Sequence, residues 1–196
     1  MSKGELTKER IVAQAASLFN TKGYTGCSMG DLMNATGLKK GGIYNHFATK
    51  DDLAVAAFDH AIEQVERALR EHLKTATDER QQLLLILDFY RDYHAHPVVA
   101  GGCPLLNTMV DSDDGHPLLK TRARDTLDRW LQRLTRIIER GQQAGLFDPT
   151  ADARQWATVI FATIHGGMAL SRYQSQPAMA KLMTHLTHSV RRALQF

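Results

Sequence analysis

Apolar residues recur at helical spacing along nearly the whole chain of 196 residues, and this spacing constrains the fold more than any other feature. Near the N-terminus, Ile11, Ala15, Leu18 and Phe19 fall at positions i, i+4, i+7 and i+8, which share one face of an α-helix. No stretch shows the sustained alternation of apolar and polar residues that is typical of a half-buried strand. The sequence therefore predicts an all-α protein.

Helix start and stop signals divide this pattern into segments. Ser28 followed by Asp31, and Thr49 followed by Asp52, match the capping box that opens a helix. Gly23 and Gly37 stand where helices should end, since glycine tolerates the left-handed backbone that follows a last turn. We predict about nine helices, over residues 7–22, 29–36, 39–47, 50–74, 78–94, 103–110, 117–143, 153–172 and 177–194.

Positive charge is concentrated at the N-terminal end. Residues 1–47 contain six Lys/Arg and three Asp/Glu, whereas residues 48–196 contain 18 of each. This asymmetry favours an N-terminal segment that faces a polyanion and a larger neutral body with another task, although a chance scatter of lysines would give the same count. The two cysteines show no CxxC or Cys/His spacing, so neither a disulfide framework nor a zinc finger is expected.

Two short predicted helices joined by a turn at Gly37 follow the first helix, and the second is rich in Lys, Asn, Tyr and His. This is the pattern of a helix-turn-helix. The stretch MGDLMNATGLKKGGIYNHFATKDDL, preceded by AASLFNTKGYTGCS, closely resembles the DNA-binding domain of the tetracycline-repressor (TetR) family. The resemblance covers about residues 11–53 and includes Leu18, Phe19, Tyr24, Tyr44 and Phe47.

The resemblance implies a helix-turn-helix DNA-binding domain of three helices over residues 1–50. A helical ligand-binding and dimerisation bundle follows over residues 51–196. We expect a ligand-responsive transcriptional repressor that binds a palindromic double-stranded operator as a homodimer. A small apolar, aromatic or electrophilic effector would release it. We expect no cofactor, no metal site, no membrane segment and a cytoplasmic location.

The expected DNA-binding residues come from matching positions of the motif: Ser28, Lys39, Lys40, Gly41, Tyr44, Asn45, His46 and Lys50. Tyr44, His46 and Lys50 would contact phosphates, whereas Lys39 and Asn45 can read base edges in the major groove. Alternatives stay open for each. Lys39 or Lys40 could contact phosphate, capping alone would explain Ser28, and surface solubility would explain an exposed tyrosine or lysine.

The expected ligand-binding residues lie on helices that surround a cavity in this family: Phe58, Phe89, Tyr90, Tyr93, Cys103, Trp130, Leu134, Ile164 and Met168. Taken singly, each is better explained as plain core. Cys103, at the predicted start of a helix after Gly101 and Gly102, resembles the sensing cysteine of some electrophile-responsive members. The alternative is a small buried hydrophobe, and Cys27 is expected only to pack.

The two C-terminal helices are expected to form a four-helix dimer interface through their apolar faces. The residues of these faces are Trp156, Ile160, Gly167, Leu182, Met183, Leu186 and Val190. An enzyme is the main rival class, but the sequence contains no nucleophile elbow, phosphate-binding loop, HExxH motif or paired-carboxylate pattern. His94 and His96, at i and i+2, would face apart on a helix, so a metal site there is not expected.

Overall fold

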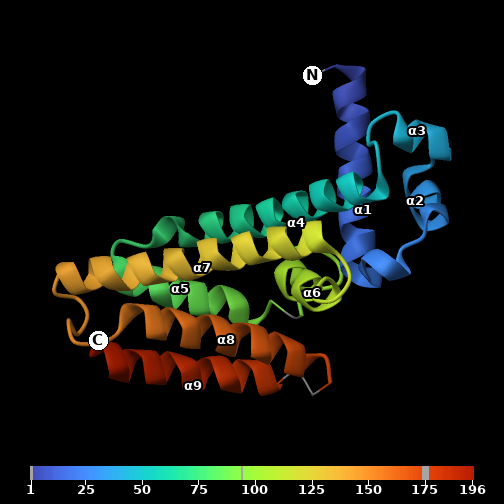
Figure 1. Cartoon of the computed structure of the whole chain (residues 1–196). Helices are drawn as coiled ribbons and strands as arrows, with labels where there is room; N and C mark the ends of the chain where they lie inside the picture. The colour runs from blue at the N-terminus through green and yellow to red at the C-terminus, as the bar shows by residue number, and fades with distance from the viewer. Residues whose placement is uncertain (1, 94, 174–176) are drawn as a thin grey trace. The chain divides into compact units, whose positions relative to one another are not determined.

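The computed structural model describes residues 2–93, 95–173 and 177–196. Within these ranges the chain forms nine α-helices and one 3₁₀ turn and contains no strand, which confirms the predicted all-α fold (Figure 1). None of the described helices is long and apolar enough to cross a membrane. The elements are α1 (Lys3–Gly26), α2 (Met29–Thr36), α3 (Lys40–Tyr44), α4 (Lys50–His72), η1 (Leu73–Thr75), α5 (Glu79–Arg91), α6 (Pro104–Asp111), α7 (Pro117–Gln143), α8 (Ala153–Ser171) and α9 (Pro177–Leu194).

Helix α1 is longer than its sequence pattern predicts at both ends. It begins at Lys3 because Ser2 and Glu5 form a capping box that the apolar periodicity does not reveal. It continues to Gly26 across a kink at Gly23, whose φ of 74° departs from helical geometry. Gly23 therefore ends the first regular stretch of helix, as the sequence predicts, and a further helical segment follows it to Gly26.

Two other predicted helices are shorter in the structure. Helix α3 covers only Lys40–Tyr44, since the backbone leaves helical geometry soon after Asn45. Helix α5 ends at Arg91, and His94, which the prediction included, lies outside the described residues. The predicted starts of α2, α7, α8 and α9 agree with the structure.

The chain divides into two compact units. The first comprises Met1–Glu66 and Pro97–Asp125. Within it α1 packs against α2 and α6. Its core includes Ile11, Leu32, Ile43 and Leu53, and the sequence pattern predicts that Ile11 and Ile43 are buried.

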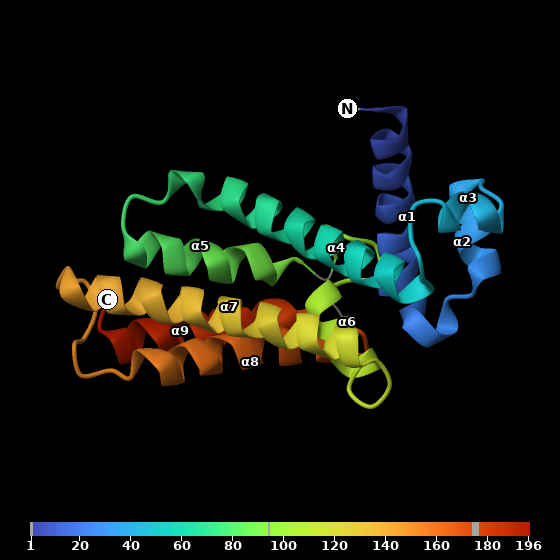
Figure 2. The ribbon, with the colours of Figure 1, turned by 45° about the horizontal axis from the view of Figure 1, so that its top comes forward.

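The second unit comprises Arg67–His96 and Thr126–Phe196. Within it α9 packs against both α8 and α5, and α8 and α9 run side by side (Figure 2). Its core is formed by apolar side chains from four helices: Leu83, Ile86, Leu134, Ile138, Ile160, Met183 and Val190. The predicted boundary near residue 50, between a DNA-binding and a ligand-binding domain, is a functional division and stays a prediction.

Candidate functional site

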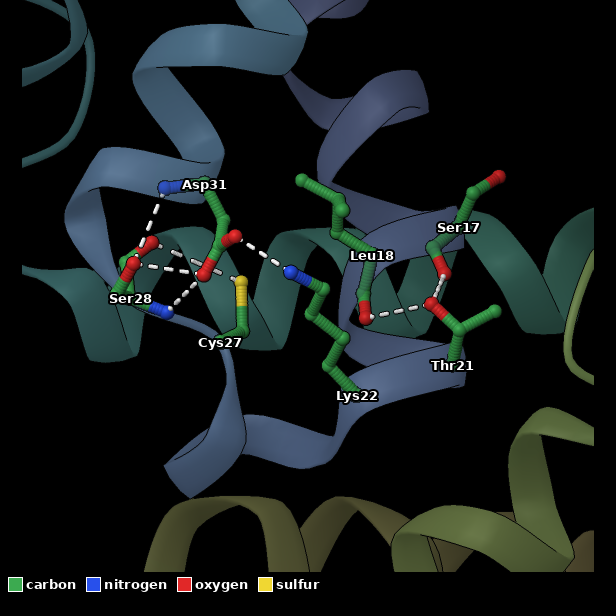
Figure 3. A network of polar contacts seen from close by, with 7 residues as sticks. All are labelled: Ser17, Leu18, Thr21, Lys22, Cys27, Ser28 and Asp31. Atoms are coloured by element: carbon green, nitrogen blue, oxygen red, sulfur yellow. Dashed lines mark hydrogen bonds and ion pairs between the residues drawn. The ribbon is translucent and has the colours of Figure 1, made fainter.

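Side-chain capping fixes the start of α2. The Ser28 Oγ accepts a hydrogen bond from the backbone N–H of Asp31 at 3.1 Å, and the Asp31 carboxylate accepts one from the Ser28 N–H at 2.8 Å (Figure 3). The Lys22 ammonium pairs with the same carboxylate. The contact with Lys22 contributes most, followed by those with Ser28, and together they hold the pKa of Asp31 far below its usual range. The predicted capping box is confirmed. The ion pair between Lys22 and Asp31 links α2 to α1.

A tight turn then directs α3. Gly37 has a φ of 67°, in the left-handed region, and its N–H donates to the Met33 carbonyl at 2.9 Å. Ile43 and Phe47 are buried and fasten α3 to the unit. The opposite face of α3 is therefore turned toward solvent.

The solvent face of α3 carries most of the predicted DNA-binding residues. Lys39, Lys40, Gly41 and Asn45 are exposed, and Tyr44 is 38% exposed. The Lys40 ammonium lies 5.7 Å from the centre of the Tyr44 ring. A Cβ on Gly41 would meet no atom within 4 Å, so nothing in the folded chain requires glycine there. Two short helices with a tight turn and a polar, cationic second helix can enter a major groove.

The remaining predicted DNA contacts are placed differently. Ser28 is exposed and His46 is half-buried. The Lys50 ammonium donates to the Tyr24 carbonyl at 2.7 Å and lies 4.2 Å from the centre of the Tyr24 ring. Lys50 thus binds a protein carbonyl in this structure, and its predicted contact with phosphate stays a prediction.

Tyr24 joins three segments of the first unit. Its hydroxyl donates to Asp51, its backbone N–H donates to Asp111 Oδ2 at 2.7 Å, and the His116 ring packs edge-on at 4.2 Å between centroids. Burial and the contact with Asp51 raise the pKa of Tyr24 to about 12, so the phenol stays protonated. No local pattern marks Asp111 or His116 as partners of Tyr24, because both lie more than 80 residues further along the chain.

Two glycines permit close approach between α1 and residues 101–111. A Cβ on Gly101 would lie 2.7 Å from the Asn20 carbonyl oxygen, and its φ of 93° already disfavours other residues. The Asn20 amide donates to the carbonyls of Ala100 and Gly102, at 2.8 and 3.0 Å. A Cβ on Gly23 would likewise lie 2.7 Å from the Asp111 carboxylate.

Cys103 is the N-cap residue of α6, as the sequence predicts, but its side chain is only 6% exposed. Gly101 packs against Asn20 and Thr21 of α1, so the turn before Cys103 does not leave its sulfur open to solvent. Cys27 is also buried, and burial raises the pKa of its thiol. Burial favours the packing role for both cysteines.

Aromatic side chains gather around Tyr90 inside the second unit. The Tyr90 ring centre lies 5.1 Å from that of Phe89, 5.5 Å from Tyr93 and 5.9 Å from Trp130. Leu134, Ile164 and Met168 are buried in the same unit, whereas Phe58 and Cys103 belong to the first unit. The structure thus brings together the four predicted aromatic residues of the second unit, and the ligand-binding role of the whole set stays a prediction.

His165 is a member of this cluster that the sequence reasoning missed. Its ring stacks on Phe161 at 3.8 Å and lies 6.4 Å from Tyr90. The Nδ1 atom is 2.9 Å from the Phe161 carbonyl, so the neutral ring donates from Nδ1. Burial lowers the pKa of His165 to about 4. Its position four residues after Phe161 was the available signal, since that spacing places both rings on one helix face.

Metal ligation finds no support among the described residues, which contain no group of three or more His, Cys, Asp or Glu side chains suited to a metal ion. His94, one of the two histidines considered from the sequence, lies outside those residues.

Comparison with known proteins identifies the class. Residues 11–57 match the family described as "Bacterial regulatory proteins, tetR family", and residues 80–186 match "Tetracyclin repressor-like, C-terminal domain". A TetR transcriptional regulator from Chloroflexus aurantiacus J-10-FL has a similar crystal structure, with a TM-score of 0.94 and 39% identity, covering 99% of this chain and 98% of that one.

Two curated relatives are similar over shorter shares of their own length. A regulator from Lactococcus lactis subsp. lactis, described as "Uncharacterized HTH-type transcriptional regulator in lacX 3'region", is 29% identical over 110 residues, which are 54% of this chain and 54% of that protein. The A-factor receptor protein of Streptomyces griseus is 26% identical over 190 residues, or 94% of this chain and 63% of that protein. The chain thus spans about half to two thirds of these relatives.

The helix-turn-helix and the helical body together define a DNA-binding transcriptional regulator and not an enzyme. The chain belongs to the TetR family of transcriptional regulators, whose members bind DNA through the N-terminal domain and generally form dimers and respond to ligands.

Proposed function

We propose that this protein is a cytoplasmic repressor that binds a palindromic operator as a homodimer and dissociates when a small apolar, aromatic or electrophilic effector binds. The observation that carries the proposal is the solvent face of α3, where Lys39, Lys40, Tyr44 and Asn45 stand beside a turn fixed by Gly37. A single reading helix makes few base contacts, so two copies on a dyad are needed for specific binding.

The division of labour on this face follows from side-chain chemistry. Lys39 and Asn45 can make hydrogen bonds to guanine and adenine edges, whereas the Tyr44 hydroxyl suits a phosphate oxygen. Asn45→Ala should change the preferred base at particular positions. Tyr44→Phe should weaken binding to all duplexes and leave the slope of log affinity against log salt unchanged, because a neutral phenol releases no counterion when it contacts a phosphate. Gel shifts at several salt concentrations, on the promoter region beside the gene, measure both effects.

Uniform weakening by both variants, with no change in base preference, would contradict this division. Val110→Ala is the control, since Val110 is an exposed apolar residue on α6, outside the helix-turn-helix. It should leave both the affinity and the salt slope unchanged.

Some of the residues predicted to form the dimer interface are buried within one chain and need correction. Ile160, Met183 and Val190 are fully buried in the chain's own core, so their predicted contacts with a second copy are wrong. The large apolar side chains exposed on α8 are Val159 and Leu170, at 39% and 53%. Leu170 also lines a hollow of about 190 Å³ with Gly167, Ala178, Met179 and Leu182, formed where α8 meets α9. These exposed residues support dimerisation through the same two helices.

Val159→Asp combined with Leu170→Asp should therefore produce monomers, because two unpaired carboxylates per chain would be buried in the two-fold interface, which is costly. Sedimentation at micromolar protein concentration measures the oligomeric state. Val110→Asp, at an apolar residue that is 74% exposed outside these helices, is the matched control and should remain dimeric. A wild-type monomer would overturn the proposal.

The aromatic cluster around Tyr90 supports an effector with an apolar or aromatic body. Effector and operator would favour different separations of the two α3 helices of the dimer. Each should therefore weaken binding of the other by the same factor. An effector that binds equally to free and operator-bound protein would rule out this mechanism.

A further inference from the structure

Five arginines line one groove of about 490 Å³ in the second unit, and the proposed function gives them no role. Arg129, Arg133, Arg136 and Arg140 come from α7, and Arg70 comes from the end of α4. The four residues of α7 follow each other at i, i+4, i+7 and i+11, so they share one helix face. Like charges at this spacing destabilise a helix, and packing alone does not explain them.

Little negative charge on the protein compensates this stripe. The Arg140 Nε pairs with Glu79 at 3.2 Å. Arg129 donates to the Thr126 hydroxyl at 3.0 Å, and the Arg133 guanidinium lies 5.9 Å from the centre of the Trp130 ring. Within the part of the chain that the structure describes, no carboxylate lies at ion-pair distance from Arg129, Arg133 or Arg136.

The acidic residues of α7 face elsewhere. Asp128 and Glu139 line a separate hollow of about 390 Å³ on the neighbouring side of the helix, which Arg136 also borders. The arginine groove is therefore strongly cationic, and an anion bound there would not meet a carboxylate from these two residues.

The other lining residues narrow the chemistry of the anion. Gln82 and Gln132 add amide hydrogen-bonding groups, and Leu73 and Ile137 add an apolar surface. Guanidinium groups bind phosphate oxygens in planar, two-point geometry. The volume lies within the range of small-molecule sites, about 300–1,000 Å³. Walls from α4, η1, α5 and α7 enclose the groove on more than one side, which suits a small molecule better than a convex DNA duplex.

We propose that this groove is a second ligand site, which binds a small organic anion carrying two or more phosphate groups. The proposal goes beyond operator binding and the effector, because all nine lining residues belong to the second unit and none lies on α3. Loss of phosphate binding and loss of DNA binding are therefore separable.

The test is calorimetric titration of the full-length protein with sodium tripolyphosphate and, separately, with inorganic phosphate, at matched ionic strength. Tripolyphosphate should bind at one site per chain and at least about 100-fold more tightly than phosphate, because several charge-assisted hydrogen bonds form together. Equal affinities for the two anions would overturn the proposal.

Substitutions locate the site. Arg133→Gln combined with Arg136→Gln should weaken tripolyphosphate binding at least about 10-fold, since two charged donors are lost. Arg129→Gln combined with Arg136→Gln tests the same stripe without disturbing the contact between Arg133 and Trp130. Arg124→Gln is the matched control, because Arg124 is an exposed arginine of α7 outside the groove. A control that loses as much affinity as the groove variants would mean unspecific charge attraction and would overturn the site.

A final experiment distinguishes binding of phosphate groups on a small molecule from binding of the phosphates of DNA. Fluorescence anisotropy with a labelled random-sequence duplex should give the same affinity for wild type and both groove variants. Parallel loss of duplex and tripolyphosphate binding would identify the groove as a DNA-contact surface and would contradict the proposal.

Discussion

The two compact units are stabilised by different kinds of contact. In the first unit, polar side chains fix where the helices begin and how they meet, as with Ser28 at α2 and Asp111 on the backbone of Tyr24. In the second unit, large rings around Tyr90 and the neutral His165 join an aliphatic core that includes Leu83 and Ile138. The first unit thus adds directional polar contacts to its apolar core, whereas the second adds packed aromatic rings to its own.

The largest expected effect is on the aromatic core. Trp130→Ala should lower the free energy of unfolding by about 3–5 kcal/mol, because it removes a buried indole beside Tyr90 and leaves a cavity. Urea denaturation measures this loss. Trp156→Ala, at a half-buried tryptophan of α8, is the control and should cost clearly less. Equal losses would show that the cluster around Tyr90 has no special part in stabilising the unit.

A pH effect of intermediate size should come from His165. Its folded-state pKa of about 4 lies below the unfolded value of 6.5, so the unfolded chain binds an extra proton between these values. The stability due to the neutral ring is present above pH 6.5 and is lost as the pH falls toward 4. Wild type should lose roughly 3 kcal/mol more than His165→Gln between pH 7 and pH 4.

Urea denaturation at several pH values measures this difference. His185→Gln is the control, because His185 is exposed on α9, and it should follow wild type. Identical pH curves for wild type and His165→Gln would show that burial does not suppress protonation of this ring.

The smallest expected effect concerns the cap of α2. Ser28→Ala should cost about 1 kcal/mol, because the N–H of Asp31 loses its acceptor, whereas Ser28→Asn should retain most of the stability since asparagine also caps well. Thermal unfolding of the three proteins measures the series. If the alanine and asparagine variants are equally stable, the hydroxyl has no capping role.

This contrast also explains what could be predicted from the sequence. The starts of α2 and α4 are marked by residues three positions apart, Ser28 with Asp31 and Thr49 with Asp52, so local chemistry was sufficient. The solvent face of α3 could also be predicted, from the motif and from the apolar pair Ile43 and Phe47, which mark the opposite, buried face. Local signals also placed the starts of α7 and α9 at proline.

Contacts between distant segments could not be predicted in this way. Asp111 reaches Tyr24 across 87 residues, and the arginine groove combines residues of α4, α5 and α7. The burial of Ile160 and Met183 within one chain, in place of a partner's surface, likewise depends on how α8 and α9 pack. A helical pattern shows which face is apolar but does not show what covers it.

Two copies of the α3 face should together read a palindrome. This can be tested by selecting duplexes from a random-sequence library with the full-length protein and then sedimenting the selected complex. We expect an inverted repeat whose half-site centres are separated by about 34 Å, which is one helical turn, or by a multiple of it, and an even number of chains on each duplex. An enriched site without two-fold symmetry, bound by one chain, or no enriched site at all, would contradict it.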